Sequence, residues 1–179
     1  SRRFVWVVDP IDGTRAYMAG SPDWAVCVAL LEDGIPIAGV VHAPASRASY
    51  AALRGGGAAR NDAPIRTSGV SELAAARIAG PKPMLDALAR QGSFVAVDKI
   101  PSLALRLTRI ADASIDAGLV SPDSRDWDLA AADLVLSEAG GKLTTAEGAP
   151  VRYNQAHPVH GMLVASGTAL LPPLDQALR

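Results

Sequence analysis

Short apolar runs separated by turn residues dominate the first third of the chain. Four of them have the length and composition typical of strands, namely residues 4–8, 24–32, 35–42 and 48–53. The second and third runs meet at Asp33-Gly34, a dipeptide that favours a two-residue hairpin turn. The fourth leads into the sequence RGGGAARND, and residues 65–67 are expected to return as its partner. The pattern predicts an antiparallel meander that follows a buried central strand at residues 4–8.

The pattern changes after residue 70, where helices and strands alternate. Helices are expected at residues 83–91, 102–113, 127–139 and 172–178, and a short Ala-rich helix is expected to open at Ser71. Strands are expected at residues 77–79, 94–97, 114–119 and 162–166, and from residue 142 onward. Ser102 and Asp126 are the expected N-caps of two helices, and Gly140-Gly141 ends the second of these. This succession predicts an α/β fold in which sheet and helix layers alternate.

Composition and charge narrow the class of protein. The chain has 179 residues, of which 49% are hydrophobic, enough for a substantial core. Its 17 Lys+Arg balance 18 Asp+Glu, and the basic residues are scattered singly, which argues against binding a nucleic-acid polymer. Cys27 is the only cysteine and fits a reducing compartment. The longest apolar run, WAVCVALL, is far shorter than the roughly 18 residues of a membrane span. We therefore expect a cytoplasmic protein that does not bind membranes.

The first candidate chemistry lies in the sequence DPIDGT, directly after the run FVWVV. Asp9 and Asp12 are three positions apart with a proline between them, so their carboxylates can converge on one cation, and oxygen ligands of this kind suit Mg²⁺. A short helix that starts near Thr14 would direct backbone N–H groups and a hydroxyl at an anion held by the metal. The alternative is that both aspartates only stabilise a tight turn and cap a helix.

A second candidate lies about 115 residues further along the chain. Asp128 follows Trp127 in the first turn of a strongly apolar helix, where it could equally be an ordinary N-terminal acid. The pair of motifs, DPIDGTRAY early and WDLAAADLVLSEAGG late, with RGGGAARNDAPIRTS between them, resembles the inositol monophosphatase family of metal-dependent phosphatases, which includes 3′(2′),5′-bisphosphate nucleotidases. The resemblance extends over essentially the whole chain.

The resemblance implies roles for the residues of these motifs. Asp9 matches the carboxylate that bridges two Mg²⁺ ions, Ile11 a residue that lends its main-chain carbonyl, and Asp12 and Asp128 the ligands of the second ion. Gly13 and Thr14 match the phosphate-binding pair. In the family, two or three ions activate a water for in-line attack on phosphorus and stabilise the leaving alkoxide. Sensitivity to Li⁺ and a homodimer are further implications.

The resemblance also implies a layered α/β fold of the phosphatase type and a division into two parts. Residues 1–70 are expected to hold the metal-binding strand and the meander, and residues 71–179 a C-terminal lobe with the helix that begins at Trp127. The family carries a Gly-Glu-Glu segment ahead of the DPIDGT strand, and its glutamate binds a metal. This sequence does not contain that segment, so we expect it to be a truncated or cleaved form.

The substrate is the least determined part of the prediction. Ser102 lies where the family often contacts substrate, although Pro101 replaces the usual glycine and helix capping alone would explain the serine. Val120 and Ser121 occupy the places of a glutamate that grasps inositol hydroxyls. Arg125 could meet a second phosphate or could simply be a solvated loop residue.

The sequence therefore predicts a Mg²⁺-dependent phosphomonoesterase that acts on a small phosphate ester. A bisphosphorylated nucleotide such as 3′-phosphoadenosine 5′-phosphate is mildly favoured over an inositol phosphate, while histidinol phosphate and sugar bisphosphates remain alternatives. An alternative of another class is a non-catalytic phosphate-binding fragment that lacks the essential glutamate. The histidines His42, His157 and His160 show no ligand spacing, and the sequence HPVH reads as loop.

Overall fold

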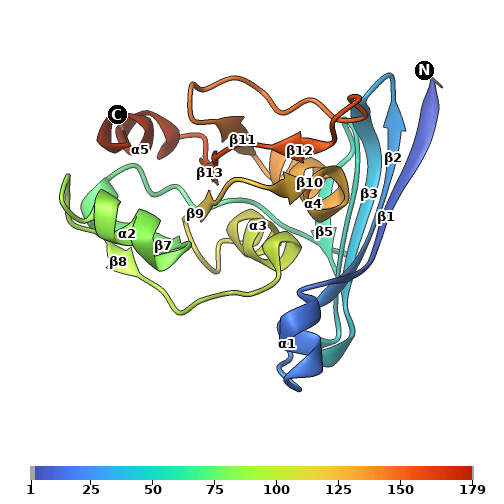
Figure 1. Cartoon of the computed structure of the whole chain (residues 1–179), viewed down its shortest axis with the longest axis horizontal. Helices are drawn as coiled ribbons and strands as arrows, with labels where there is room; N and C mark the ends of the chain where they lie inside the picture. Colours follow the sequence, from blue (N-terminus) through green and yellow to red (C-terminus); the bar gives the residue numbers. More distant parts are fainter. Residues whose placement is uncertain (1–2, 179) are drawn as a thin grey trace.

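The computed structural model describes residues 3–178 and contains two large sheets with helices between and beside them (Figure 1). The first sheet has six antiparallel strands in sequence order, β1 to β6. Their bounds are Phe4–Asp12, Ala25–Glu32, Ile35–Ala43, Ala48–Leu53, Gly57–Arg60 and Ala63–Pro64. Each strand pairs with the next one along the chain, so the predicted meander is confirmed.

The second sheet has five strands in the order β11-β13-β9-β7-β8. Their bounds are Gly141–Thr145 for β11, Leu163–Gly167 for β13, Ala117–Val120 for β9, Arg77–Ala79 for β7 and Val95–Ala96 for β8. β7 pairs in parallel with both of its neighbours, while β13 is antiparallel to its own. A separate two-stranded pair joins β10 (Ser124–Arg125) to β12 (Val159–His160).

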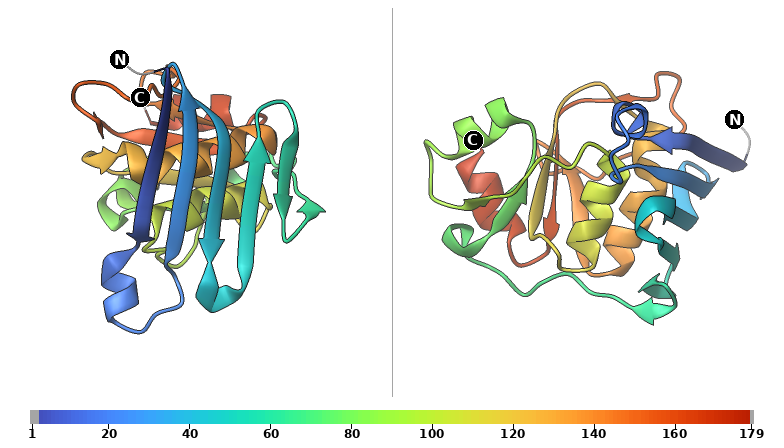
Figure 2. Two further views of the ribbon diagram at one scale, coloured as in Figure 1. Left: turned by 90° about the vertical axis from the view of Figure 1, so that its right-hand side faces the viewer. Right: turned by 90° about the horizontal axis from the view of Figure 1, so that it is seen from below.

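Two helices fill the space between the sheets, and two more cover the far side of the second sheet (Figures 1 and 2). The inner pair is α3 (Leu103–Ala111) and α4 (Asp126–Glu138), which pack against each other and against strands of both sheets. The outer pair is α2 (Lys82–Leu88) and α5 (Leu171–Ala177). The predicted alternation of sheet and helix layers is therefore confirmed. Whether the chain also divides at residue 70 stays a prediction.

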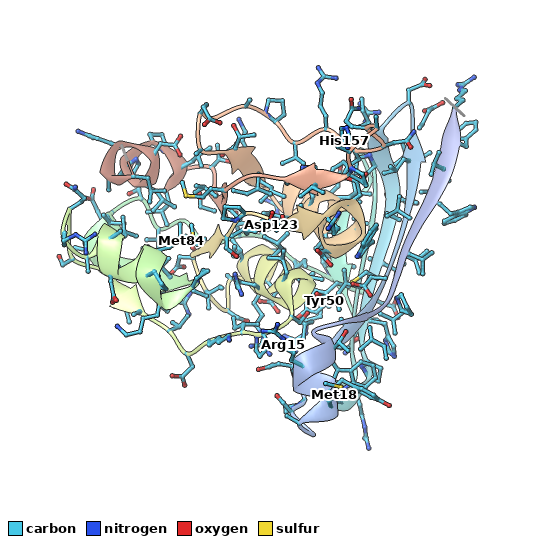
Figure 3. The ribbon with its side chains drawn as sticks, in the orientation of Figure 1. Arg15, Met18, Tyr50, Met84, Asp123 and His157 are labelled. Atoms are coloured by element: carbon cyan, nitrogen blue, oxygen red, sulfur yellow. The ribbon has the colours of Figure 1, made fainter. Side chains whose placement is uncertain are left out.

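Burial explains why α4 lies at the centre of the molecule. It is apolar on almost all sides, and Leu129, Val135 and Leu136 are fully buried. A helix without a polar face can be accommodated only where it is covered all around. The core cluster around it joins side chains from the first sheet, α3, α4 and the second sheet, and a smaller cluster lies under α2 and α5. Figure 3 shows side chains filling the spaces between these layers. No helix in the described residues is long and apolar enough to cross a membrane.

The first strand differs from its prediction in length and position. β1 runs on to Asp12, and within the described residues it is an edge strand that pairs only with β2. Phe4, Trp6 and Val8 are 51%, 65% and 51% exposed, because no described element covers the outer face of the sheet there. The interpretation of FVWVV as a buried central strand was therefore wrong.

The partner of β4 is also not the predicted one. β5 at Gly57–Arg60 pairs with β4, and residues 65–67 are not in a strand. The turn closes early because Gly55 and Gly57 adopt positive φ angles, and the carboxylate of Glu138 accepts hydrogen bonds from both of their N–H groups, at 2.8 and 2.9 Å. Glu138 thus links the hairpin turn to the end of α4.

Some helix boundaries also need correction. Ser71 opens no α-helix, and only a 3₁₀ turn forms at Leu73–Ala75 before the chain enters β7. Asp126 is the first residue of α4 and not its N-cap, a position taken by Arg125. Ser102 is the N-cap of α3 as predicted, since its hydroxyl accepts a hydrogen bond from Leu105 N at 3.1 Å.

A close approach at Gly39 of β3 sets the distance between the first sheet and α4. A Cβ atom built on Gly39 would lie 2.9 Å from the carbonyl oxygen of Ala131. We expect Gly39→Ala to reduce stability by about 1–3 kcal/mol, because backbone atoms of a packed helix cannot yield as a side chain can. Thermal unfolding measures this effect. Gly161→Ala is the matched control, since nothing lies within 4 Å of a Cβ there, and equal melting temperatures for the two variants would contradict the prediction.

Candidate active site

The two aspartates of the DPIDGT motif point to the same side of β1 because the strand is irregular between them. Asp9 pairs with Cys27 and Asp12 with Ala25, so two residues of β1 between these pairs oppose a single residue of β2. In a regular strand, residues three apart face opposite sides of the sheet. The extra residue of the bulge restores a common orientation. Both aspartates are accordingly buried, at 8% and 6% exposure.

The carboxylate of Asp12 is fixed by the start of α3. Its Oδ2 accepts a hydrogen bond from Ala104 N at 2.8 Å and a second from the Ser102 hydroxyl. Ser102 is completely buried, and its oxygen also caps α3. The sequence offered helix capping and substrate contact as alternatives for Ser102. The structure shows the capping and adds a bond to Asp12, while contact with substrate stays a prediction.

Asp128 completes a group of three carboxylates. It lies in the first turn of α4, where its Oδ2 accepts a hydrogen bond from Arg125 N at 2.7 Å. One oxygen from each of Asp9, Asp12 and Asp128 lies within 4.8 Å of the others. We call these three residues the carboxylate triad. Three oxygen ligands at this spacing can bind one or more hard cations such as Mg²⁺.

The electrostatics of the triad favour bound positive charge. Burial, together with the charges of Asp128 and Asp9, raises the pKa of Asp12 to about 6, although hydrogen bonds from Ser102 and Ala104 oppose the shift. Burial also raises the pKa of Asp9 and of Asp128, and the Asp128 charge adds to the effect at Asp9. All three groups therefore carry their negative charge at a free-energy cost that a cation would remove.

The other residues of the motif form the turn that follows the bulge. Gly13 has φ of 84°, and a Cβ atom there would lie 2.8 Å from the carbonyl oxygen of Asp23, so glycine is required. The Thr14 hydroxyl donates to the carbonyl oxygen of Ile11 at 2.9 Å and opens α1 (Thr14–Met18). This carbonyl is the one proposed as a metal ligand. The roles of Ile11, Gly13 and Thr14 stay predictions.

The start of α4 is held by contacts that the sequence did not reveal. Asp126 accepts hydrogen bonds from His160 Nε2 and from Asn154 N, both at 2.7 Å. His160 also lies edge-on to Tyr153, with ring centroids 5.6 Å apart. The interpretation of HPVH as loop was wrong for His160, which belongs to β12. No periodicity in this short segment could have indicated a pairing with β10, 34 residues away.

Arg125, the second predicted substrate residue, is exposed beside the site. Its guanidinium carbon lies 6.0 Å from the Trp127 ring centroid, while its backbone N–H binds Asp128. Its side chain does not line the cavity next to the triad. Contact between Arg125 and a second phosphate stays a prediction, and the structure gives the residue a separate task in orienting Asp128.

A cavity of about 590 Å³ opens beside the triad. Asp12 and Asp128 line one part of it. The remaining wall comes from residues 80–83 at the start of α2, residues 99–106 at the start of α3, and the loop SPDS at residues 121–124. Cavities of this volume hold small organic ligands. Its position beside the triad makes it the candidate substrate-binding site.

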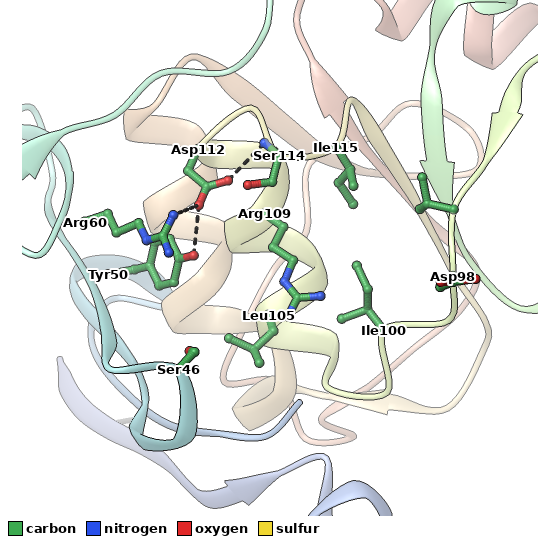
Figure 4. Close-up of a pocket in the computed structure, with 11 residues that line it drawn as sticks. Ser46, Tyr50, Arg60, Asp98, Ile100, Leu105, Arg109, Asp112, Ser114 and Ile115 are labelled. Carbon is green, nitrogen blue, oxygen red and sulfur yellow. Dashed lines mark hydrogen bonds and ion pairs between the residues drawn. The ribbon is translucent and has the colours of Figure 1, made fainter. Parts of the chain in front are cut away.

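Another cavity, of about 400 Å³, lies along α3 (Figure 4). Its polar groups satisfy one another, since Tyr50 and Arg60 both donate to Asp112 and Arg109 pairs with Asp23 outside the cluster. No group of three potential metal ligands occurs there in the described residues. The carboxylate triad and the cavity of about 590 Å³ are thus the better candidate for catalysis.

Comparison with known proteins identifies the class to which this fold and site belong. A family model described as the inositol monophosphatase family matches residues 1–176. The chain therefore belongs to the inositol monophosphatase family, as its motifs predicted.

Individual relatives carry several names. The chain is 38% identical over 157 residues to a histidinol-phosphatase of Mycobacterium tuberculosis, covering 80% of this chain and 59% of the relative. It is 35% identical over 153 residues to an inositol-1-monophosphatase of Rhizobium meliloti, with 80% and 57% covered, respectively. It is also 31% identical to a Nus factor SuhB of Xylella fastidiosa, with 99% of this chain and 68% of that protein covered.

A solved inositol monophosphatase from Anabaena superposes with a TM-score of 0.88 at 26% identity, covering 99% of this chain and 72% of the other. The chain thus spans less than two thirds of the first two relatives and about seven tenths of the solved structure. The activity of the whole protein is therefore a proposal.

The raised pKa of Asp12 yields a prediction for the metal-free protein. Because the pKa rises from 3.8 to about 6 on folding, wild-type protein loses stability as the pH rises through this window. Asp12→Asn removes this titration. With a chelator present, the free energy of unfolding of the variant should therefore rise by about 3 kcal/mol relative to that of wild type as the pH is raised from about 4 to about 6.5. Urea unfolding at several pH values measures the difference. A constant difference would contradict the assignment, and excess Mg²⁺ should reverse the order by stabilising wild type more.

Proposed function

We propose that the protein is a Mg²⁺-dependent phosphomonoesterase that acts on a small phosphorylated metabolite. The observation that carries this proposal is the carboxylate triad, two buried acids of β1 and one partly buried acid of α4 whose oxygens meet within 4.8 Å. Keeping three like charges together costs stability, and a structural role for the triad alone would not offset that cost. The phosphatases among the relatives support the reaction class.

The residues of the site divide the work of binding and orientation. Asp9, Asp12 and Asp128 would hold the metal, with the Ile11 carbonyl as a further oxygen ligand. When bound, Mg²⁺ supplies Lewis-acid charge for the phosphoryl oxygens and lowers the pKa of a bound water. Gly13 and Thr14 would bind and orient the phosphate. Ser102 and Ala104 N hold the Asp12 carboxylate in one orientation, and Arg125 N does the same for Asp128.

The proposed substrate is an inositol phosphate or a bisphosphorylated nucleotide such as 3′-phosphoadenosine 5′-phosphate. The inositol-1-monophosphatases among the relatives favour the first. Histidinol phosphate is the second candidate, because a relative at 38% identity bears the name histidinol-phosphatase. The small, polar SPDSRD loop, which has no acid at the place of the inositol-grasping glutamate, favours the nucleotide. We further propose that the reaction takes place in the cytoplasm and that the protein can form a homodimer.

Removal of one ligand of the triad tests the reaction. We expect Asp9→Asn, made in the whole protein as its gene encodes it, to lower Mg²⁺-dependent phosphate release by about 100-fold or more. Its folding should be little affected, because the substitution relieves repulsion within the triad. Asp62→Asn is the matched control, an exposed residue with φ of 66° that asparagine adopts equally well. Near wild-type turnover by Asp9→Asn would remove the triad from the mechanism.

Lithium provides a second test that needs no substitution. The family resemblance implies that Li⁺ occupies one metal position, so millimolar Li⁺ should inhibit phosphate release in competition with Mg²⁺. An equal concentration of Na⁺ is the control for ionic strength. Inhibition that does not weaken as Mg²⁺ is raised would speak against a shared position at the triad.

A further inference from the structure

The cavity beside the triad is larger than the hydrolysed phosphate requires. It extends from Asp12 and Asp128 to Lys82 in α2 and to Lys99 in the segment after β8. In Figure 1, α2 and β8 lie on the opposite side of the molecule from β1. One end of the cavity therefore lies at the triad, and the other end lies near α2 and β8. A volume of about 590 Å³ accommodates a ligand well beyond a single phosphate group. The chemistry of the second end therefore bears on which substrate fits.

Charge is distributed unevenly along this cavity. Two carboxylates of the triad line one end, while Lys82, Lys99 and Arg106 supply the positive charge of the wall. Asp123, labelled in Figure 3, is the one acidic lining residue of the described chain outside the triad, and it is exposed. Once the triad is neutralised by cations, the cavity carries net positive charge. Such a cavity attracts an anion beyond the one held at the metals.

Arg106 is the most informative of the three basic residues. It is 8% exposed, and its two terminal nitrogens donate to the carbonyl oxygens of Leu119 and Ile100 at 2.8 Å. Its Nε has no hydrogen-bond partner among the described residues, and it forms no ion pair with them. Burial lowers the pKa of Arg106, and the charge of Asp12 opposes that shift. A buried cation without a carboxylate partner is costly unless an anion lies nearby.

A second unsatisfied atom lies in the same wall. Ser124 is 7% exposed, and its hydroxyl oxygen has no hydrogen-bond partner in the described part of the chain. This oxygen has almost no exposed surface, so it belongs to the cavity wall and does not contact a ligand directly. Lys99 makes neither an ion pair nor a side-chain hydrogen bond with the described residues, and Lys82 pairs only with Asp86 on the surface. Lys99 is therefore available to a ligand, and Lys82 becomes available when it leaves Asp86.

We infer that Lys82, Lys99 and Arg106 form a subsite for a second anionic group, a phosphate or carboxylate, on the same molecule whose phosphate is hydrolysed at the triad. This inference rests on the proposed function. Lys82 and Lys99 supply the mobile charges. Arg106 contributes a fixed positive potential from within the wall. The subsite selects esters with two anionic groups over esters with one.

The same subsite disfavours the cationic alternative. Histidinol phosphate carries an ammonium group, which Lys82 and Lys99 would repel. The same lysines would attract the second phosphate of an ester with two phosphates. Like charges brought together in a partly buried cavity repel substantially. The subsite should therefore strengthen the binding of a two-phosphate ester and weaken the binding of histidinol phosphate.

The experiment compares two ligands that differ only in the second anion, 3′-phosphoadenosine 5′-phosphate and adenosine 3′-phosphate. In the whole protein with Mg²⁺, Lys99→Gln and Lys82→Gln should each reduce kcat/KM about fivefold more for the first than for the second. Lys142→Gln, in β11 and away from this cavity, is the matched control and should leave the ratio unchanged.

Equal losses for the two ligands, or an equal effect of Lys142→Gln, would overturn the subsite. Calorimetric binding in Mg²⁺ separates this inference from the proposed function. If the protein releases no phosphate from any ester, the proposed function fails, and a binding preference for the two-phosphate ligand that is lost in Lys99→Gln would still support the subsite. Absence of any such preference in wild-type protein would refute it. Circular dichroism of each variant verifies folding.

Discussion

Mutual repulsion among three desolvated carboxylates, two of them buried, is the constraint on which the rest of this structure depends. Asp9, Asp12 and Asp128 belong to two elements more than 110 residues apart, and each is desolvated. Nothing in their own chemistry holds them together without a cation. The fold must therefore supply the force, and it does so by burying α4 between two sheets so that its first turn can only lie beside the bulge of β1. Hydrophobic burial offsets electrostatic cost.

Each member of the triad is oriented by a different device. A bulge turns Asp9 and Asp12 to one side, the start of α3 binds Asp12, and the backbone of Arg125 binds Asp128. The pair of strands β10 and β12 fixes the approach to α4 through Asp126 and His160. Because these devices are backbone hydrogen bonds and packed helix ends, the site is organised before any ligand arrives.

The sequence indicated the triad but not its surroundings. Asp9 and Asp12 stand in a short motif whose proline and glycine constrain the backbone, and the Trp-Asp pair starts a helix with a clear apolar pattern. Arg106, in contrast, reads as an ordinary helix residue, because its burial depends on β9 and on the segment before α3. His160 and Asp126 meet only through tertiary pairing. The misplaced partner of β4 has the same origin, since the turn is closed by Glu138 from a distant helix. Local periodicity carries no information about such contacts.

The bulge in β1 has a consequence for the solubility of the protein as well as for its chemistry. β1 is an edge strand within the described residues, and its exposed side chains include Phe4 and Trp6. A long apolar edge of this kind invites strands of other molecules to extend the sheet. The extra residue between Asp9 and Asp12, together with Pro10, which has no N–H to donate, interrupts the ladder that such a strand would need. The irregularity that brings Asp9 and Asp12 to one side therefore also shortens the edge that another strand could pair with in the described part of the chain.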